Sequence, residues 1–523
     1  MDGSGAGKSA SYSIPNAYQC LGSYIFTDPK GELYDRTAGY LRSKGYEIKV
    51  LNLVRPEYSD GYNPLFHIKS ELDVDVIANT IVKGQKSEGG QDPYWDDMAE
   101  MLLKALIYYL IATRPEEEQN LASCAELVRA ANNNGGNNLL TELMSELPLD
   151  HPARMYYKSI EIAPDRTYSS ILSSLQSKLG KFDSKEIADL TSTDTISFED
   201  IGSKKTAVYV ISSDTHTAYD FLLTIFFSQL IQQLYDFADL NGGRLKERTY
   251  FILDEFANIG KIPDFDKKIS TSRSRGISFS VILQSVDQLE AVYEKSYEVI
   301  MGNCDTHLFL GSNSYKTVEY FSKQLGEATI ERDSRSVSRD KEHHKTGTSS
   351  SDQVMARALM TPDELRRLDN DLCIIFEKGL KPIKANKFYY FKHPMAKEME
   401  GLEISHNDIG TIERGTWRKF NPYNPYVEDK EEEKNLDITS LDDLFSDDEE
   451  ENIDNKEDSK KEKIENSSND DVQELNEKNP NYSENEKSEE KEESNDEDYD
   501  LQKELEAKFD ELFGPMDDDE DEN

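Results

Sequence analysis

Residues 249–285, TYFILDEFANIGKIPDFDKKISTSRSRGISFSVILQS, predict a strand, a helical connection and a second strand. Two short apolar runs, at 250–253 and 279–283, are rich in Ile, Val and aromatic residues, which is typical of strands buried on both faces of a parallel sheet. The first run ends in Asp254 and Glu255, and the second ends in Gln284. Because the carboxyl ends of such strands face the ligand crevice of an open α/β sheet, we expect these three side chains to share a site.

The residue types at these two strand ends are those that nucleotide hydrolysis requires. Asp254 fits the carboxylate of a Walker B motif, which holds Mg²⁺ through water, and Glu255 is placed to polarise the attacking water. Gln284 is placed to sense the γ-phosphate. Four apolar residues followed by an acidic pair also describe an acidic turn after a buried strand, so this pattern alone does not decide the function.

The N-terminal sequence MDGSGAGKS supplies the complement of that pattern. Its end predicts a P-loop, in which backbone N–H groups wrap the phosphates of ATP, Lys8 reaches the β- and γ-phosphates, and the Ser9 hydroxyl ligates Mg²⁺. The residues expected to hold the nucleotide are Gly3, Ser4, Gly5, Ala6, Gly7, Lys8 and Ser9. Together with Asp254 as a metal ligand, this loop predicts ATP and Mg²⁺ as cofactors.

The loop departs from the usual motif in two ways. Asp2 stands where G-x-x-x-x-G-K-[ST] has its first glycine, and no strand leads into the loop. Since a strand and a helix normally hold a P-loop in shape, we expect either a longer protein that continues upstream of Met1 or a defective fragment. Without that strand, ladder groups of its neighbours would be buried and unpaired, so the sequence also predicts poor stability.

Composition separates a globular body from a charged tail. The 523 residues exceed one ordinary domain, and most of the net charge of −43 lies in the last fifth of the chain. That part consists mainly of Glu, Asp, Lys, Asn and Ser, so we predict a disordered acidic tail at 427–523. The four cysteines match no metal spacing, which suits a reducing compartment. With no signal peptide and no apolar run of about 18 residues, the chain is expected to be soluble as written.

The predicted elements form a sheet that helices interrupt. Strands at 23–27 and 48–53 flank a helix, and strand signals then vanish until residues 206–212, which points to a parallel α/β sheet with an insertion. We predict the first part of a nucleotide-binding domain at 1–69, an all-α insertion domain at 70–190, and the second part of the nucleotide-binding domain at 191–426.

Two features of this body leave alternatives open. The run Asp28 to Glu32 follows a strand, where Lys30 could approach a phosphate, but a turn that caps the next helix explains the run equally well. The helical insertion carries Tyr94, Trp95, Tyr108 and Tyr109. Base stacking is one use for these rings, but their helical spacing favours core packing.

The last part of the body reads as short elements around a long connection. We predict a strand at 306–311, a helix at 315–325, and a final strand at 373–377 whose hairpin partner lies within 386–391. Residues 332–353 are rich in serine and charge and are predicted to be a mobile loop. His343 and His344 lie in it without a spaced carboxylate or cysteine, so a solvated loop is favoured over a metal site.

Several motifs together resemble a known family. GSGAGKS, DPKGEL, DPYWDDMAEMLLKAL, FILDEFANIGKIPDF, SRSRGISFSVILQS and LMTPDELRRLDNDLCIIF, in this order, are similar to the TraG-type coupling ATPases of type IV secretion and conjugation. The resemblance covers nearly all of residues 3–391.

The resemblance implies a RecA/FtsK-like P-loop motor that assembles as a homo-hexamer at the cytoplasmic face of the bacterial membrane. It implies DNA, relaxase or relaxosome proteins and secretion-channel components as partners, with ATP hydrolysis feeding the transferred strand into the channel. The resemblance implies that Lys8 and Ser9 bind phosphate and Mg²⁺ and that Asp254 binds Mg²⁺. It also implies that Glu255 is the catalytic carboxylate and Gln284 the sensor. Arg273 corresponds to an arginine finger that reaches a neighbour's nucleotide, with Arg275 as second choice. Relatives usually have membrane helices before the P-loop, and this sequence does not.

Two other functions remain open at this stage. One is an FtsK-like duplex DNA translocase, and the other is a receptor or adaptor that binds secretion substrates without hydrolysing ATP. Two tail segments with helical apolar spacing, residues 438–445 and 501–513, are candidate docking peptides.

Overall fold

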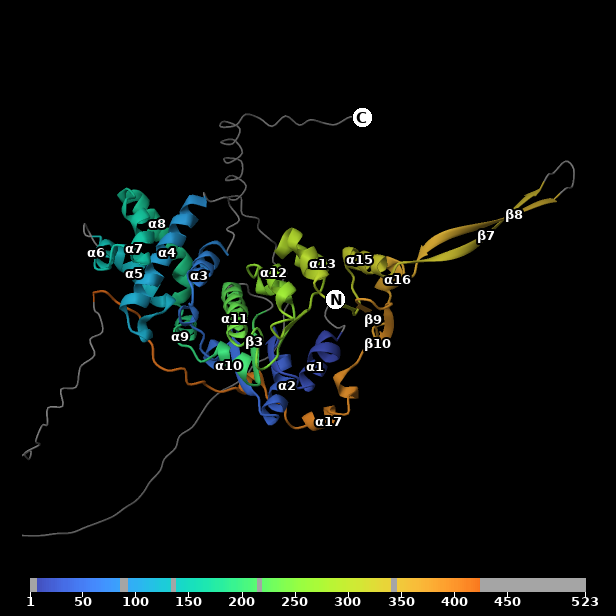
Figure 1. Cartoon of the computed structure of the whole chain (residues 1–523), viewed down its shortest axis with the longest axis horizontal. Coiled ribbons are helices and arrows are strands. Elements are labelled where there is room, and N and C mark those ends of the chain that lie inside the picture. The colour runs from blue at the N-terminus through green and yellow to red at the C-terminus, as the bar shows by residue number, and fades with distance from the viewer. Residues whose placement is uncertain (1–6, 85–92, 133–137, 214–218, 340–345, 424–523) are drawn as a thin grey trace, which may run out of the picture. The chain divides into compact units, whose positions relative to one another are not determined.

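A five-stranded, fully parallel sheet lies at the centre of the protein. The computed structural model describes residues 7–84, 93–132, 138–213, 219–339 and 346–423, within one compact unit, Met1–Lys430. The strand order is β2-β3-β1-β4-β5. These strands are β1 (Ser23–Thr27), β2 (Glu47–Asn52), β3 (Thr206–Ile211), β4 (Thr249–Leu253) and β5 (Ile277–Val281). Figure 1 labels β3 of this sheet. The predicted parallel α/β architecture is therefore confirmed.

Both faces of this sheet are covered, as the continuous apolar runs predict. Alternate strand residues pack to opposite sides, so Phe26 joins the cluster under α1 and α2 while Ile25 joins the one under α11. The helices that accompany the sheet are α1 (Ile14–Tyr18), α2 (Glu32–Ser43), α11 (Asp220–Leu240), α12 (Phe265–Thr271), α13 (Val286–Tyr293) and α14 (Tyr297–Gly302). Strand β5 starts two residues earlier than predicted, which leaves Leu283 and Gln284 beyond its end. It is the outer strand on its side of the sheet.

The segment between β2 and β3 is helical, as expected. It contains α3 (Glu71–Lys83), α4 (Pro93–Thr113), α5 (Leu121–Asn132), α6 (Leu139–Ser145), α7 (Pro152–Glu161), α8 (Asp165–Leu179), α9 (Lys185–Thr191) and α10 (Phe198–Ser203). Its apolar core is continuous with that of α11. Tyr109 is buried, and Trp95 and Tyr108 pack against the core, which confirms core packing for these three; Tyr94 is exposed.

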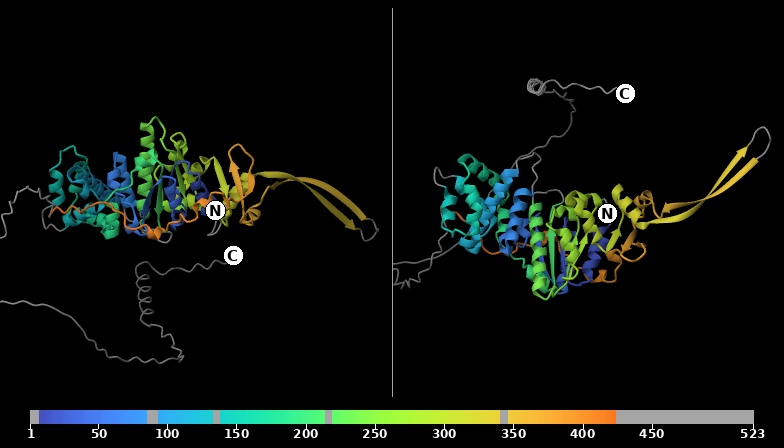
Figure 2. Two further views of the ribbon diagram at one scale, coloured as in Figure 1. Left: turned by 90° about the horizontal axis from the view of Figure 1, so that it is seen from below. Right: turned by 45° about the horizontal axis from the view of Figure 1, so that its top comes forward.

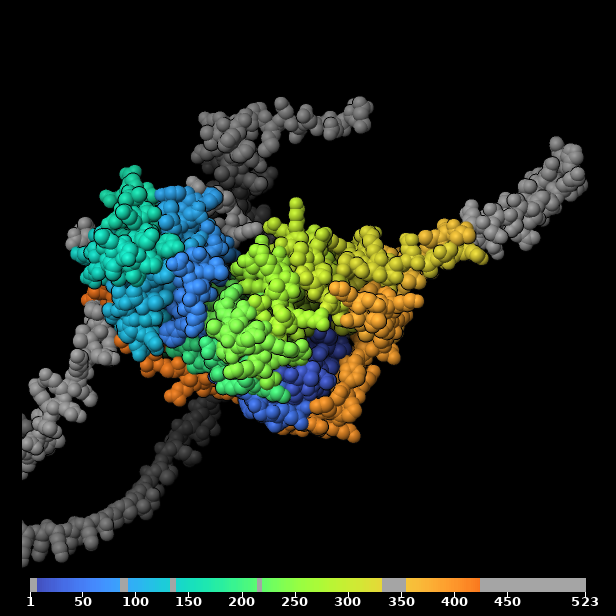
Figure 3. Space-filling model, in the orientation of Figure 1, coloured from blue at the N-terminus to red at the C-terminus, as the bar shows by residue number. Residues whose placement is uncertain are grey.

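The last part of the body contains a small sheet and a long hairpin. The elements are β6 (Thr306–Phe309), α15 (Tyr315–Leu325), β7 (Glu327–Arg339), β8 (Thr346–Ala358), α16 (Pro362–Arg366), β9 (Leu372–Glu377), β10 (Ile383–Asn386) and α17 (Ala396–Met399). Strands β10, β9 and β6 form an antiparallel sheet. The hairpin of β7 and β8 projects from the body (Figure 1). The space-filling view in Figure 3 shows the base of the hairpin in yellow.

Two predictions for this region are wrong. Residues 332–339 and 346–353 belong to the paired strands β7 and β8 rather than to a mobile loop. Their sequence carries no alternation of apolar and polar residues, so the pattern that predicts a half-buried strand is missing from it. The partner of β9 is Ile383–Asn386, ahead of the predicted window. His343 and His344 lie outside the described residues.

After α17 the chain runs as an extended strap over the surface, drawn in orange in Figure 2. The strap first contacts α2, where Ile404 N–H donates to the Asp35 carbonyl at 3.2 Å. It then reaches the helical insertion, where Trp417 Nε1 donates to Asp189 Oδ1 at 2.7 Å and Phe420 is buried. The strap thereby ties the helical insertion to the sheet. The predicted tail that follows, with both candidate docking peptides, lies outside the described residues.

The turn after β1 caps a helix, as one of the two alternatives for Asp28–Glu32 predicts. Gly31 has φ 70°, and Asp28 Oδ2 accepts the N–H of Tyr34 at 2.8 Å in the first turn of α2. Lys30 is exposed. Burial raises the pKa of the Asp28 carboxyl from 3.8 to about 7, although the N–H groups of Tyr34 and Leu33 oppose this.

This buried carboxyl gives a prediction for Asp28→Asn. Because the pKa in the folded state is raised, the unfolded chain releases its proton first, so stability is lost between about pH 4 and pH 7. The total is about 4 kcal/mol at 1.36 kcal/mol per pKa unit. Asparagine keeps an acceptor for Tyr34 without a charge. Urea denaturation should therefore show a variant close to the wild type at pH 4 and more stable by up to this amount at pH 8.

The exposed Asp165→Asn on α8 serves as the control for this comparison. Parallel pH profiles for Asp28→Asn and wild type would contradict the prediction.

Candidate nucleotide site

Lys8 meets the acidic pair at the end of β4. Its Nζ lies 2.7 Å from Glu255 Oε1 and 3.6 Å from Asp254 Oδ1. The three side chains are only 12%, 18% and 11% exposed, respectively. Two segments that are almost 250 residues apart in the sequence therefore converge at the carboxyl end of β4, which is the arrangement predicted from the sequence.

Gln284 joins the same group from beyond β5. Its Nε2 donates to Glu255 Oε1 at 2.8 Å, so Glu255 holds Lys8 and Gln284 on one oxygen. The two chain segments are also tied by their backbones, since Ile282 N–H donates to the Leu253 carbonyl at 3.0 Å. The predicted grouping of Asp254, Glu255 and Gln284 is thus present in the geometry.

Glu255 has an uncommon backbone conformation. Its φ of 50° and ψ of 46° lie in the left-handed region, which residues other than glycine rarely adopt. Such a conformation costs about 1–3 kcal/mol and persists where the surroundings fix it. Here its N–H donates to Asp254 Oδ1 at 3.0 Å, while Thr27 Oγ1 donates to the Asp254 carbonyl at 2.7 Å. Neighbouring strands therefore hold the turn that aims the Glu255 side chain at Lys8.

The electrostatics of the site centre on Asp254. Burial raises the pKa of its carboxyl, the nearby Glu255 raises it further, and Lys8 lowers it. Two carboxylates and one ammonium leave an excess negative charge in a poorly solvated place. A cation is the natural partner for this excess.

The donors present fit Mg²⁺ and a nucleotide. Mg²⁺ prefers oxygen ligands and is usually bound in proteins by one or two carboxylates together with substrate phosphates. Asp254 supplies such a carboxylate, and the Ser9 side chain, next to Lys8, supplies a hydroxyl. Among the described residues no cluster of three His, Cys, Asp or Glu side chains could hold a metal alone, so the phosphates would complete the ligand set.

The described part of the P-loop is anchored to β5. Gly7 has φ 69°, and its carbonyl accepts the N–H of Ser11 at 2.7 Å at the start of a short helix, Ser9–Ser13. From that helix, Tyr12 Oη and Ser280 Oγ of β5 are hydrogen-bonded at 2.7 Å. Gly3, Ser4, Gly5 and Ala6 lie outside the described residues.

The two candidate arginine fingers lie in different surroundings. Neither contacts the cluster of Lys8, Asp254, Glu255 and Gln284 (the Lys8 group). Arg275 makes a bidentate pair with Asp239, at 3.0 and 2.9 Å, and covers the ring of Tyr235 at 4.7 Å. Arg273 is 90% exposed and only approaches Asp305, at 3.6 Å. Arg273 is thus the more accessible of the two arginines, and its role as an arginine finger stays a prediction.

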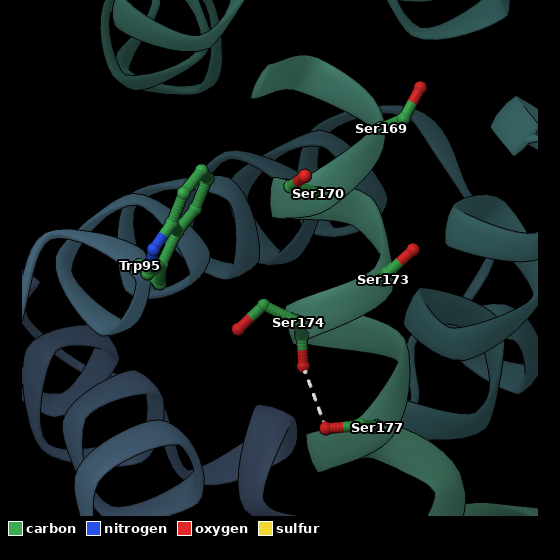
Figure 4. A pocket seen from close by; sticks show the side chains of 6 residues that line it. All are labelled: Trp95, Ser169, Ser170, Ser173, Ser174 and Ser177. Carbon is green, nitrogen blue, oxygen red and sulfur yellow. Dashed lines mark hydrogen bonds between the residues drawn. The ribbon is translucent and has the colours of Figure 1, made fainter. Parts of the chain in front are cut away.

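A cavity of about 440 Å³ lies elsewhere, in the helical insertion. Figure 4 shows Trp95 of α4 facing the serines of α8 across it. The hydroxyls of Ser169 and Ser170 bond to backbone carbonyls of their own helix. This cavity shares no residue with the Lys8 group.

Sequence reasoning missed Tyr389. Its ring lies against the P-loop, since a Cβ added to Gly7 would come within 3.2 Å of Tyr389 Cε1. Nothing local in the sequence signals this contact, because Gly7 and Tyr389 lie far apart in the chain.

Among the described residues, no helix has the length and apolar character that a membrane span requires.

The fold and the Lys8 group define an α/β P-loop NTPase-like protein. A family model described as Type IV secretory system Conjugative DNA transfer matches residues 1–410, and the chain belongs to that family. The predicted relationship to conjugative coupling proteins is confirmed.

Individual relatives are similar at low identity. The conjugal transfer protein TraG of Agrobacterium fabrum (strain C58 / ATCC 33970) is 24% identical over 444 residues, covering 80% of this chain and 64% of that protein. A conjugal transfer protein TraG of Escherichia coli is 25% identical over 424 residues, covering 75% and 66%. The chain thus spans just under two thirds of their length. A solved structure, the plasmid coupling protein TrwB in complex with ADP and Mg²⁺, is similar with 15% identity and a TM-score of 0.44, covering 72% of this chain and 88% of that chain.

Proposed function

We propose that this chain is the motor part of an ATP-driven coupling protein, which delivers relaxase-bound DNA to a type IV secretion channel during conjugation. The observation that carries the proposal is the convergence of Lys8 with Asp254, Glu255 and Gln284 in a chain of the conjugative DNA transfer family. Each supplies a group that phosphoryl transfer from ATP needs.

The residues divide the chemistry between them. Lys8 and the backbone of residues 3–9 hold the triphosphate, and Ser9 and Asp254 hold Mg²⁺, which would neutralise charge on the phosphates. Glu255 orients and polarises the attacking water. Gln284 positions Glu255 through its 2.8 Å hydrogen bond and is placed to respond when a γ-phosphate displaces Lys8 from that carboxylate.

The partners follow from the same proposal. The protein would work as a homo-hexamer at the cytoplasmic face of the membrane, with relaxosome proteins delivering the strand and channel components receiving it. An acidic protein can still hold DNA, because phosphate contacts need lysine and arginine only where the strand passes.

The decisive experiment is ATP hydrolysis by the full 523-residue chain, with and without single-stranded and duplex DNA. We expect Mg²⁺-dependent turnover that DNA stimulates severalfold. The Glu319→Gln variant, which alters a half-buried glutamate of α15 away from the site, should hydrolyse ATP as the wild type does. Absence of turnover together with retained binding of a relaxase or of DNA would contradict the motor and favour a receptor that does not hydrolyse ATP.

A further inference from the structure

Two stacked aromatic rings, of which one lies against the P-loop and the other is exposed, follow β10. The segment after β10 brings Tyr389 against Gly7, and the rings of Tyr389 and Phe391 stack at 5.2 Å with an angle of 11° between their planes. Phe391 is 59% exposed. Large apolar side chains this exposed are notable when they adjoin a ligand site.

The pair is held in place rather than loosely attached. Tyr389 Oη donates to Asp371 Oδ1 at 3.2 Å. The intervening Tyr390 packs edge-on against Tyr18 of α1, with ring centroids 6.2 Å apart, and against Phe391, at 5.5 Å. Lys392 Nζ lies 5.0 Å from the centre of the Tyr389 ring. Tyr390 thus anchors the segment to α1, while Tyr389 lies against the loop and Phe391 stacks on Tyr389.

We infer that Tyr389 and Phe391 form the subsite for the purine base of the bound nucleotide. This inference rests on the proposed function, because it needs Lys8 and the loop to hold the phosphates. The phosphates then lie at Gly7 and Lys8, beside the Tyr389 ring. Phe391, which stacks on Tyr389, extends this aromatic surface. A base that leaves the phosphates in this direction packs on the exposed part of the Phe391 ring.

The chemistry of this surface predicts its selectivity. Ring carbons offer a stacking face, which every purine can use, whereas the Tyr389 hydroxyl is already bonded to Asp371. The subsite therefore accepts adenine and guanine nucleotides alike, and it adds affinity that inorganic triphosphate cannot gain.

The test compares ligands with and without a base. Calorimetric titration of the full chain with Mg²⁺ and non-hydrolysable ATP and GTP analogues, and separately with inorganic tripolyphosphate, should give similar affinities for the two analogues. Phe391→Ala should weaken both analogues about tenfold, the range for loss of one base–aromatic stack, and leave tripolyphosphate unchanged. Phe388→Ala is the matched control, because this ring is 51% exposed in the same segment but contacts His393.

The outcomes separate this inference from the function on which it rests. Unchanged analogue binding by Phe391→Ala, or an equal loss for analogues and tripolyphosphate, overturns the base subsite while leaving the P-loop intact. A loss of the same size in Phe388→Ala also overturns it. A wild-type chain that binds neither analogue nor tripolyphosphate contradicts the nucleotide site itself, and the base subsite with it.

Discussion

The Glu255→Gln variant is expected to lose at least about 100-fold of its ATP turnover while it still binds ATP, because a positioned general base contributes about 10²–10⁴-fold. Glutamine has nearly the same shape and can keep the hydrogen bond to Gln284, but it cannot accept a proton from water. The change also removes one of two neighbouring carboxylates, so Lys8 can pair with Asp254 alone. Single-turnover hydrolysis and calorimetric ATP binding measure the two effects separately.

Lys8→Ala is the informative comparison for Glu255→Gln. Loss of the ammonium removes the contact to the β- and γ-phosphates and leaves Asp254 and Glu255 without their counter-charge, so ATP binding should fail before chemistry does. Equal ATP binding by Lys8→Ala and wild type would show that this lysine does not hold phosphate. Wild-type turnover in Glu255→Gln would remove Glu255 from the catalytic role.

The grouping of the site residues was more predictable from the sequence than the backbone conformation and the contacts around them. Asp254, Glu255 and Gln284 could be placed together because the carboxyl ends of adjacent parallel strands meet at one edge, and residue type then gave their chemistry. The left-handed backbone of Glu255 and the contact of Tyr389 with Gly7 could not be predicted, since both depend on packing between segments distant in the sequence. The roles themselves, including those of Gly3–Ala6, stay predictions.

The fold was predictable where burial imposes a pattern. The run TAVYVI of β3, which is buried at every position, is typical of a central strand, and the helical insertion shows its 3.6-residue period. The hairpin of β7 and β8 was missed because its sequence shows no such pattern, although its backbone is paired along the strands. The strap after α17 was missed for a related reason, because it is fixed by scattered contacts, such as Trp417 with Asp189, rather than by a regular element.

The fold places Arg273 far from the candidate site of its own chain. It precedes the amino end of β5, whereas the Lys8 group lies at the carboxyl ends of β4 and β5. A five-residue strand is roughly 17 Å long, so Arg273 lies at the opposite edge of the sheet from its own chain's candidate site. Arg275 is no substitute, since Asp239 and Tyr235 hold it. If Arg273 acts on a nucleotide, it acts on that of another subunit.

Arg273→Ala should therefore keep ATP binding and fold stability but lose about 10³-fold of turnover, the effect of removing an arginine finger. Its side chain is 90% exposed, so the folded chain loses no buried contact. Mixing Arg273→Ala with Glu255→Gln tests the supply between subunits, because an Arg273→Ala subunit keeps Glu255 and can receive Arg273 from a Glu255→Gln neighbour. We expect the mixture to regain turnover that neither variant has alone. The control is Arg366→Ala, which alters an exposed arginine of α16. A mixture as inactive as its components would exclude a finger shared between subunits.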